Sequence, residues 1–268
     1  MKPLNERVII IKGAGEMATG VACRLHGANF RRILMLEVPA PLAVRRKVSF
    51  CEAIHDRAMT VEGIGAVRVD DEAELQEAWD RGRIAVTVDP EGTSVGRYRP
   101  DVLIDATLAK RNLGISKGDA PLVVGLGPGF TAGTDCHVVI ETNRGHDLGR
   151  LITEGMAEAD TGIPGDIGGY TKERVLRAPA AGLFTAGKDI GDLVRAGEVI
   201  GQVGTAPVTT RIDGVLRGLI RPGTEVRQGL KIGDVDPRGI AGYCHTVSEK
   251  ARSLGGAVLE AILAVYNG

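Results

Sequence analysis

The residues with the clearest chemical potential form a glycine-rich turn after an apolar run. Gly13 and Gly15 follow the run 8–11, and a segment with helical spacing begins at Glu16. A strand, tight turn and helix in this order let backbone N–H groups and the helix N-terminus bind a pyrophosphate. Glu37 ends the next apolar run, 24 residues after Gly13, where an acid would bind ribose hydroxyls. These residues predict a site for a nucleotide or a dinucleotide such as NAD or NADP. The alternative is a turn without a ligand. The predicted cofactor-binding residues here are Gly13, Gly15, Glu16 and Glu37.

A second glycine-rich loop, residues 125–133, follows the apolar run 122–124 and holds four glycines and a proline. A loop after a strand lies at the sheet edge where open α/β sheets bind ligands. Its backbone amides could form an anion-binding nest, although an ordinary loop is the alternative. The cofactor-binding residues predicted in this loop are Gly127, Gly129, Thr131 and Gly133.

Three side chains near these loops could carry acid–base chemistry. Asp105 ends an apolar run, Lys110 follows it, and His137 comes shortly after the second loop. A carboxylate, an amine and an imidazole can each move protons, so these three are the predicted catalytic residues. The alternative is a polar face on a half-buried strand. The spacing of cysteines and histidines matches no zinc pattern, so we predict no metal site.

The elements that must position these residues alternate between short apolar runs and helical segments. Such alternation predicts a parallel sheet with helices on both faces. Between the second and third runs we expect a helix near 42–54 and an extended piece near 59–69. An amphipathic helix is expected near 246–266, with Thr246 or Ser248 as its N-cap.

Beyond residue 170 the sequence repeats itself. Residues 182–203 and 214–235 align without a gap at an offset of 32, with eight identical pairs. The repeat resembles a biotinyl/lipoyl hammerhead, in which two halves meet at a hairpin that carries a modifiable lysine. The corresponding hairpin here, 204–207, has no lysine, so we expect neither biotin nor lipoate.

The predicted fold class is therefore α/β: a Rossmann-like parallel sheet domain, then a small all-β barrel-sandwich domain and a C-terminal helix. The corresponding predicted domains are a nucleotide-binding domain over 1–165, a duplicated β hammerhead over 172–238, and a helix over 239–268 that packs on the body.

Composition excludes some partners and favours one compartment. The net charge of -1 and the 3% aromatic content argue against nucleic acid and against an anionic membrane surface. The apolar runs are too short to cross a membrane. Four scattered cysteines (Cys23, Cys51, Cys136 and Cys244) are typical of reduced thiols in the cytoplasm. We therefore predict a cytoplasmic protein.

Taken in order, several blocks resemble the accessory-protein family of the selenium-dependent molybdenum hydroxylase system. They are 12–20, 45–50, 105–112, 127–133, 140–146, 161–165 and 231–238. The resemblance covers nearly the whole chain. It implies a role in the maturation of a molybdenum hydroxylase of the xanthine dehydrogenase type, and it supplies no catalytic residues.

Three functions follow from these observations. The protein is a maturation factor that binds a nucleotide or a molybdopterin nucleotide, an NAD(P)-dependent oxidoreductase, or a non-catalytic scaffold with a vestigial glycine turn. The partner implied by the resemblance is the molybdenum hydroxylase. Association into a homo-oligomer stays open.

Overall fold

The computed structural model describes residues 2–267, which divide into two compact units. Unit 1 is formed by Met1–Pro41, Ser49–Asp160 and Val247–Gly268, and unit 2 by Leu42–Val48 and Thr161–Thr246. Each unit is described by itself. Across residues 2–267, no helix has the length and apolar character needed to cross a membrane. The predicted domain boundaries, 1–165, 172–238 and 239–268, stay predictions.

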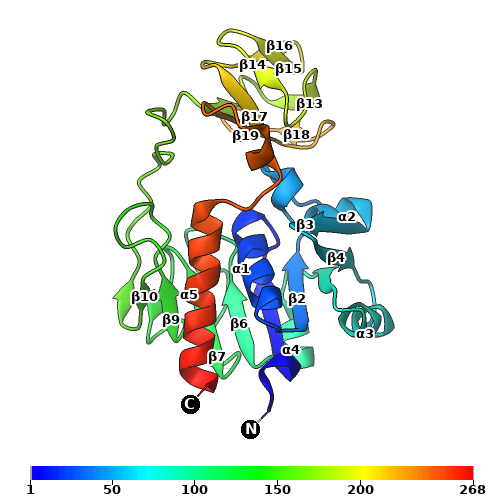
Figure 1. The fold of residues 1–268 in the computed structure, drawn as a ribbon, viewed down its shortest axis with the longest axis vertical. Helices are drawn as coiled ribbons and strands as arrows, with labels where there is room; N and C mark the ends of the chain where they lie inside the picture. Colours follow the sequence, from blue (N-terminus) through cyan, green and yellow to red (C-terminus); the bar gives the residue numbers. More distant parts are fainter. Residues whose placement is uncertain (1, 268) are drawn as a thin grey trace. The chain divides into compact units, whose positions relative to one another are not determined.

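Unit 1 is built on one nine-stranded sheet with the strand order β10-β9-β7-β6-β1-β2-β5-β4-β3 (Figure 1). Its central strands are parallel, while the pairs β3/β4 and β9/β10 at its two edges are antiparallel. The strands span β1 (Val8–Lys12), β2 (Arg32–Glu37), β3 (Ala58–Val61), β4 (Ile64–Arg68), β5 (Ile84–Val88), β6 (Val102–Asp105), β7 (Leu122–Leu126), β9 (Val138–Ile140) and β10 (Leu151–Ile152). A separate pair joins β8 (Thr131–Ala132) to β11 (Gly155–Met156).

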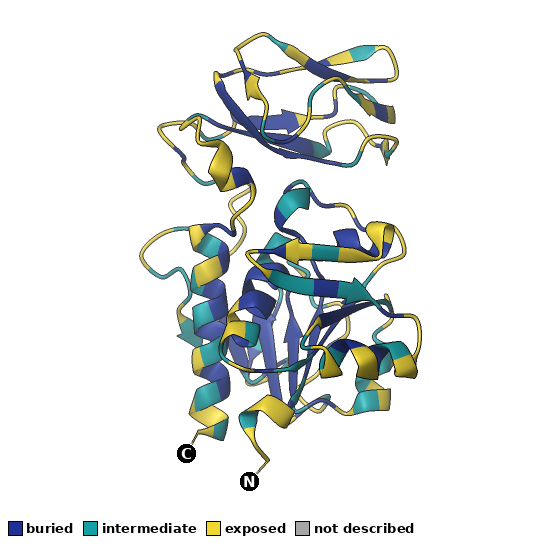
Figure 2. Ribbon diagram, turned by 45° about the vertical axis from the view of Figure 1, so that its right-hand side comes forward, coloured by how far each residue is buried: buried dark blue, intermediate teal, exposed yellow. Residues whose placement is uncertain are grey.

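Helices lie over both faces of this sheet. On one face, α3 (Glu72–Asp80) and α4 (Thr93–Tyr98) pack on alternate strand residues such as Ile10, Leu34 and Leu103. Strand residues in between point to the opposite face. That face carries α1 (Glu16–Gly27) and α5 (Glu249–Tyr266), which lie side by side (Figure 1). Figure 2 shows the sheet as a buried layer, with exposed residues on the outer sides of the helices.

Two glycines allow α1 and α5 to approach closely. A Cβ atom on Gly20 would lie 2.6 Å from Ala251 Cβ, and one on Gly255 would lie 2.8 Å from the Gly20 carbonyl oxygen. Ser248 caps α5 by accepting a hydrogen bond from the Ala251 amide, as one of the two predicted N-caps. The C-terminal helix is thus part of unit 1 although unit 2 precedes it along the chain.

The two neighbouring glycines of α5 should respond to alanine with opposite signs. Gly255→Ala places a Cβ atom against backbone that cannot move freely, so we expect a loss of about 1–3 kcal/mol in the free energy of unfolding. Gly256→Ala meets open space and replaces a poor helix former, so we expect a gain of up to about 1 kcal/mol. Urea denaturation of both variants measures the difference. Equal values would show that the helices do not require the glycine contact.

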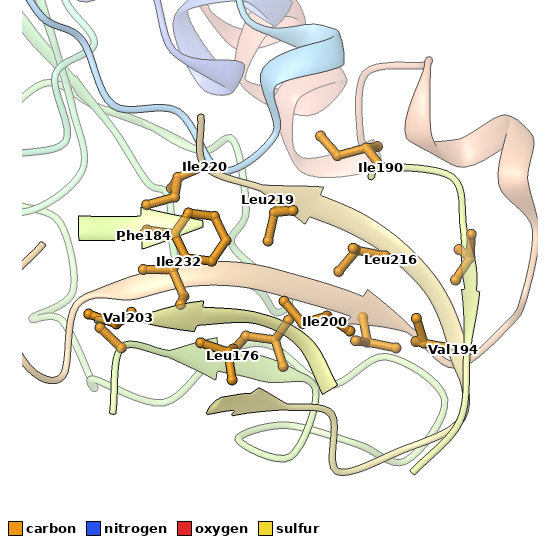
Figure 3. Close-up of a cluster of buried hydrophobic side chains, with 14 of the residues drawn as sticks. Leu176, Phe184, Ile190, Val194, Ile200, Val203, Leu216, Leu219, Ile220 and Ile232 are labelled. Atoms are coloured by element: carbon orange, nitrogen blue, oxygen red, sulfur yellow. The ribbon is translucent and has the colours of Figure 1, made fainter. Parts of the chain in front are cut away.

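Unit 2 consists of two four-stranded sheets around one apolar core (Figure 3). Phe184, Ile200 and Ile232 are fully buried in this core. One sheet has the order β12-β19-β17-β14 and the other β16-β15-β13-β18. The strands are β12 (Val175–Arg177), β13 (Gly182–Ala186), β14 (Leu193–Val194), β15 (Val199–Val203), β16 (Ala206–Thr209), β17 (Gly214–Leu219), β18 (Glu225–Val226) and β19 (Lys231–Asp236).

The sequence repeat corresponds to a structural one. Strands β13, β14 and β15 begin 32 residues before β17, β18 and β19, respectively. The short strand of each copy pairs with the first strand of the other copy, since β14 pairs with β17 and β18 pairs with β13. Neither copy therefore completes its sheets alone.

The segment 42–48 departs from the sequence prediction. The Leu219 amide donates to the Val44 carbonyl at 2.8 Å, and the guanidinium groups of Arg45 and Arg46 donate to carbonyl oxygens of Tyr243 and Leu219. The expected helix over 42–54 is wrong, because the Val44 carbonyl accepts from Leu219 rather than from a helical amide, and the two arginine side chains hold the segment to unit 2. The region has only the short turn η2 (Arg46–Val48) and α2 (Glu52–Asp56), and the expected extended piece is the hairpin β3–β4.

The predicted fold class, a Rossmann-like domain followed by a small barrel-sandwich, is wrong. The large sheet is mixed, with antiparallel pairs at both edges, and the connections after β6 and β7 contain no helix. A helix from the far end of the chain, α5, covers that part of the sheet instead. Unit 2 is not a consecutive segment either, because it includes 42–48. The protein is a mixed α/β protein with a large, mainly parallel sheet.

Candidate functional site

The candidate site lies at the point in the unit 1 sheet where the strand order reverses. From β1 the sheet grows outward through β2 on one side and through β6 on the other. The last residue of β1, Lys12, pairs with Leu36 of β2 and with Asp105 of β6. Open parallel sheets bind ligands outside the carboxyl ends of their strands at such a reversal. The structure therefore brings the glycine turn, Glu37 and Asp105 to one edge.

The two positions of the turn, 13 and 15, are glycine for different structural reasons. Gly13 has a φ of +89°, and a Cβ atom there would lie 3.3 Å from the Ala106 carbonyl oxygen. Gly15 has an ordinary φ of -69° and precedes the first residue of α1. Apart from its chain neighbours, no atom of residues 2–267 lies within 4 Å of the position of its Cβ. The packing of the protein itself requires Gly13, whereas the space above Gly15 is open to a ligand.

Glu37 is bonded to the turn that it was predicted to accompany. Its Oε1 accepts a hydrogen bond from the Ala14 amide at 2.8 Å, and its Oε2 accepts one from the Val38 amide at 2.9 Å. Burial raises the pKa of this carboxyl, while the two amides and nearby His55 act in the opposite direction. Glu37 therefore holds the glycine turn against β2, and a ribose would have to share its oxygens with these amides. Glu16 is the first residue of α1, where a negative charge is favourable.

Close packing requires two glycines of the second loop. A Cβ atom on Gly127 would lie 2.5 Å from Thr142 Oγ1, and one on Gly129 would lie 2.4 Å from the Arg111 amide nitrogen. The Thr131 amide donates to Asp135 Oδ2 at 2.7 Å, and the Gly133 amide donates to the Cys136 carbonyl. Since these amides serve internal bonds, the geometry gives little support to an anion nest in this loop.

Asp105 is the most unusual of the predicted catalytic residues. It is 0% exposed, and its Oδ1 accepts hydrogen bonds from the amide and the hydroxyl of Thr107. Its Oδ2 is buried and has no hydrogen-bond partner within residues 2–267. A buried carboxylate oxygen without a partner costs free energy, so it marks a place where a donor group would be stabilised.

The other two predicted catalytic residues lie apart from Asp105. Lys110 is exposed and forms an ion pair with Asp160. His137 precedes β9, and its Nδ1 accepts a hydrogen bond from the Val123 amide in the first half of β7. Burial, and to a smaller extent Lys117, lower the pKa of His137. The structure does not place the imidazole at the carboxyl edge with Asp105, because the bond to Val123 holds it toward the start of the strands.

Sequence reasoning missed two lysines at this edge. Lys12 is 9% exposed although it ends a strand of apolar residues. Lys250, in the first turn of α5, is half-buried, and its pKa is lowered by burial and by Arg144, with Glu16 and Glu141 opposing. The sequence held a signal for each of them. A lysine is unfavourable in an apolar run, and it is also unfavourable in the first turn of a helix.

Thiol and metal chemistry receive no support from the geometry. All four cysteines are buried, and burial raises the pKa of Cys136 to about 11. Such a thiol is almost entirely protonated at neutral pH and is a poor nucleophile. In the part of the chain that the structure describes, no group of three or more histidine, cysteine or acidic residues is arranged to hold a metal ion.

Comparison with known proteins gives one clear relative. No known family model matches the chain. Uncharacterized protein YqeB of Escherichia coli K12 is 47% identical over 261 residues, which cover 97% of this chain and 48% of that protein. The chain thus spans about half the length of the curated relative that it matches.

Similarity to solved structures is weak. TcdA (CsdL) is 12% identical with a TM-score of 0.36, over 99% of this chain and 90% of that one. A succinylglutamate desuccinylase/aspartoacylase from Rhodobacter sphaeroides is 28% identical with a TM-score of 0.22, over 32% of this chain and 29% of that one. These scores are too low to transfer an activity.

Proposed function

We propose that the protein is a maturation factor for a selenium-dependent molybdenum hydroxylase and binds a nucleotide or a molybdopterin nucleotide at the glycine turn 13–15. The observation that carries the proposal is the open space above Gly15 at the start of α1. A phosphate can approach the backbone there because no side chain occupies the position. The resemblance of the sequence blocks to the accessory family supplies the pathway, the hydroxylase as partner and the cytoplasm as location.

Charge at this edge supports an anionic ligand. Lys250 at the start of α5 interacts with Glu16 at the start of α1, so the N-termini of both helices lie at this edge. The partial positive charges of two helix N-termini favour an anion between them. Lys250 adds a full positive charge at the start of α5.

The proposal is tested by replacing Gly15 with valine. The Cβ atom of the new side chain enters open space, so the fold should be kept while the phosphate is blocked. We expect cytidine or adenine nucleotides, NAD or NADP to raise the melting temperature of the wild type, and the variant to lose this shift. In a strain that lacks the gene, the wild type should restore hydroxylase activity and Gly15→Val should not.

Gly256→Ala, which meets open space on α5, is the matched control and should behave as the wild type in both assays. A deletion strain with fully active, fully loaded hydroxylase would refute the maturation role. Binding that survives in Gly15→Val would show that the turn is only structural. Turnover of NAD(P)H by the purified protein with an organic substrate would favour an oxidoreductase instead.

A further inference from the structure

A groove of about 940 Å³ lies on the face of the unit 1 sheet that carries α4. It runs between α4 and the connection from β6 to β7, where no helix covers the strands. Leu103 forms part of its floor, and Val95 and Ile115 form part of its walls. Leu103 and Ile115 are buried and Val95 is half-buried, so the groove is a hollow over the sheet with little exposed apolar surface.

Lys12 lies at the end of this groove nearest the carboxyl edge of the sheet. It is 9% exposed, and its Nζ makes one long hydrogen bond, at 3.5 Å, to the Leu113 carbonyl oxygen. No acidic side chain within residues 2–267 lies at ion-pair distance from it. Buried lysines are rare unless they are paired, because the ammonium loses its hydration. The site thus provides a desolvated cation with unused donors.

The remaining charges of the groove also favour an anion. Arg99 and Lys117 are exposed at its rim, and Lys117 donates only a 3.4 Å bond to the Gly133 carbonyl. Among the acids that line the groove, Asp101 pairs with Lys2 and Arg7, and Asp119 accepts hydrogen bonds from Ser116. Glu91 has no such bond in the described chain. Three cations therefore line the groove with two acids, Glu91 and Asp119, that form no ion pair in the described chain.

We infer that this groove is a second binding site, for an organic acid whose carboxylate or phosphate bonds Lys12 Nζ and whose body lies between α4 and the connection from β6 to β7. The acid group replaces the hydration that Lys12 loses on folding. The site does not depend on the glycine turn, because Lys12 points to the face of the sheet with α4 whereas Gly15 begins α1 on the other face.

Pterin-6-carboxylate is a suitable probe, because it is fluorescent and joins an acid group to a planar ring. We expect saturable binding to the wild type and at least about tenfold weaker binding to Lys12→Met, from the loss of one charge-assisted hydrogen bond. Gly96→Leu places a side chain in the groove from α4, where no atom lies within 4 Å of the added Cβ, and should also abolish binding. Gly96→Leu keeps the test decisive if Lys12→Met folds poorly.

Controls separate this site from the glycine turn and identify the acid group. Lys172→Met removes an exposed lysine of unit 2 and should bind the probe like the wild type, as should Gly15→Val. Benzoate and phenyl phosphate as competitors tell whether a carboxylate or a phosphate is preferred. The inference is overturned if the wild type does not bind the probe, or if Lys12→Met and Gly96→Leu bind it unchanged. Loss of binding in Gly15→Val alone would assign the probe to the glycine turn.

Discussion

Replacing Phe184 with alanine is expected to lower the free energy of unfolding of unit 2 by about 3–5 kcal/mol. The ring is 0% exposed and belongs to the single apolar core between the two sheets of the unit (Figure 3). The backbone of Gly201 passes beside it, since a Cβ atom on that glycine would lie 3.2 Å from a ring carbon. Because two sheets fix the walls of the core, the cavity left by the ring cannot collapse completely.

Differential scanning calorimetry measures this loss, and tryptophan fluorescence shows where it occurs. Trp79 is the only tryptophan of the sequence and lies on α3 of unit 1, so its signal reports that unit. The neighbouring variant Leu183→Ala is the control, because Leu183 is 44% exposed on the same strand and should cost less than about 0.5 kcal/mol. A similar effect of the two variants would contradict the assignment of the core.

Replacing Gly129 with alanine is expected to cost about 2–4 kcal/mol of stability, from positive-φ strain and overpacking together. Gly129 has a φ of +107°, and the added Cβ would lie 2.4 Å from the Arg111 amide nitrogen and 2.6 Å from the Lys110 carbonyl carbon. Both atoms are backbone, so they can move away only by displacing the loop that follows Asp105. Thermal denaturation of the purified variant measures the loss.

Gly133 provides the comparison within the same loop. Its φ is +87°, but no atom lies within 4 Å of the position of its Cβ. Gly133→Ala should therefore cost only the conformational strain, about 1–2 kcal/mol. If Gly129→Ala were no more destabilising than Gly133→Ala, the contact with the 110–111 backbone would not explain the glycine, and a ligand at the loop would become the better explanation.

The glycine loops show why a sequence motif does not reveal whether packing requires a glycine or leaves open space beside it. Gly15 and Gly129 belong to equally suggestive sequences, and each follows a buried strand at the carboxyl edge of the sheet. What distinguishes them is the space around the missing Cβ, which is empty at Gly15 and filled by backbone at Gly129. That space is formed by residues distant in the sequence, so no local pattern records it.

The sequence by itself determined the elements with strong local signals. The apolar runs became β1, β2 and β5, the segment after the glycine turn became α1, and Ser248 begins α5 as an N-cap. The duplication at an offset of 32 predicted the matching strands of unit 2. These features depend on neighbours a few residues apart or on repetition, and both are visible in the chain itself.

Only the tertiary structure determined which elements pack on the same face of the sheet and which residues meet at its edges. It assigned 42–48 to unit 2 through hydrogen bonds to distant carbonyl groups, and it replaced missing crossover helices with α5 from the end of the chain. It also separated His137 from Asp105, and it buried Lys12 at the end of a groove beside α4. The physical reason is the same in each case: burial and hydrogen bonding depend on which distant segments meet, and strand pairing settles that only when the whole sheet forms.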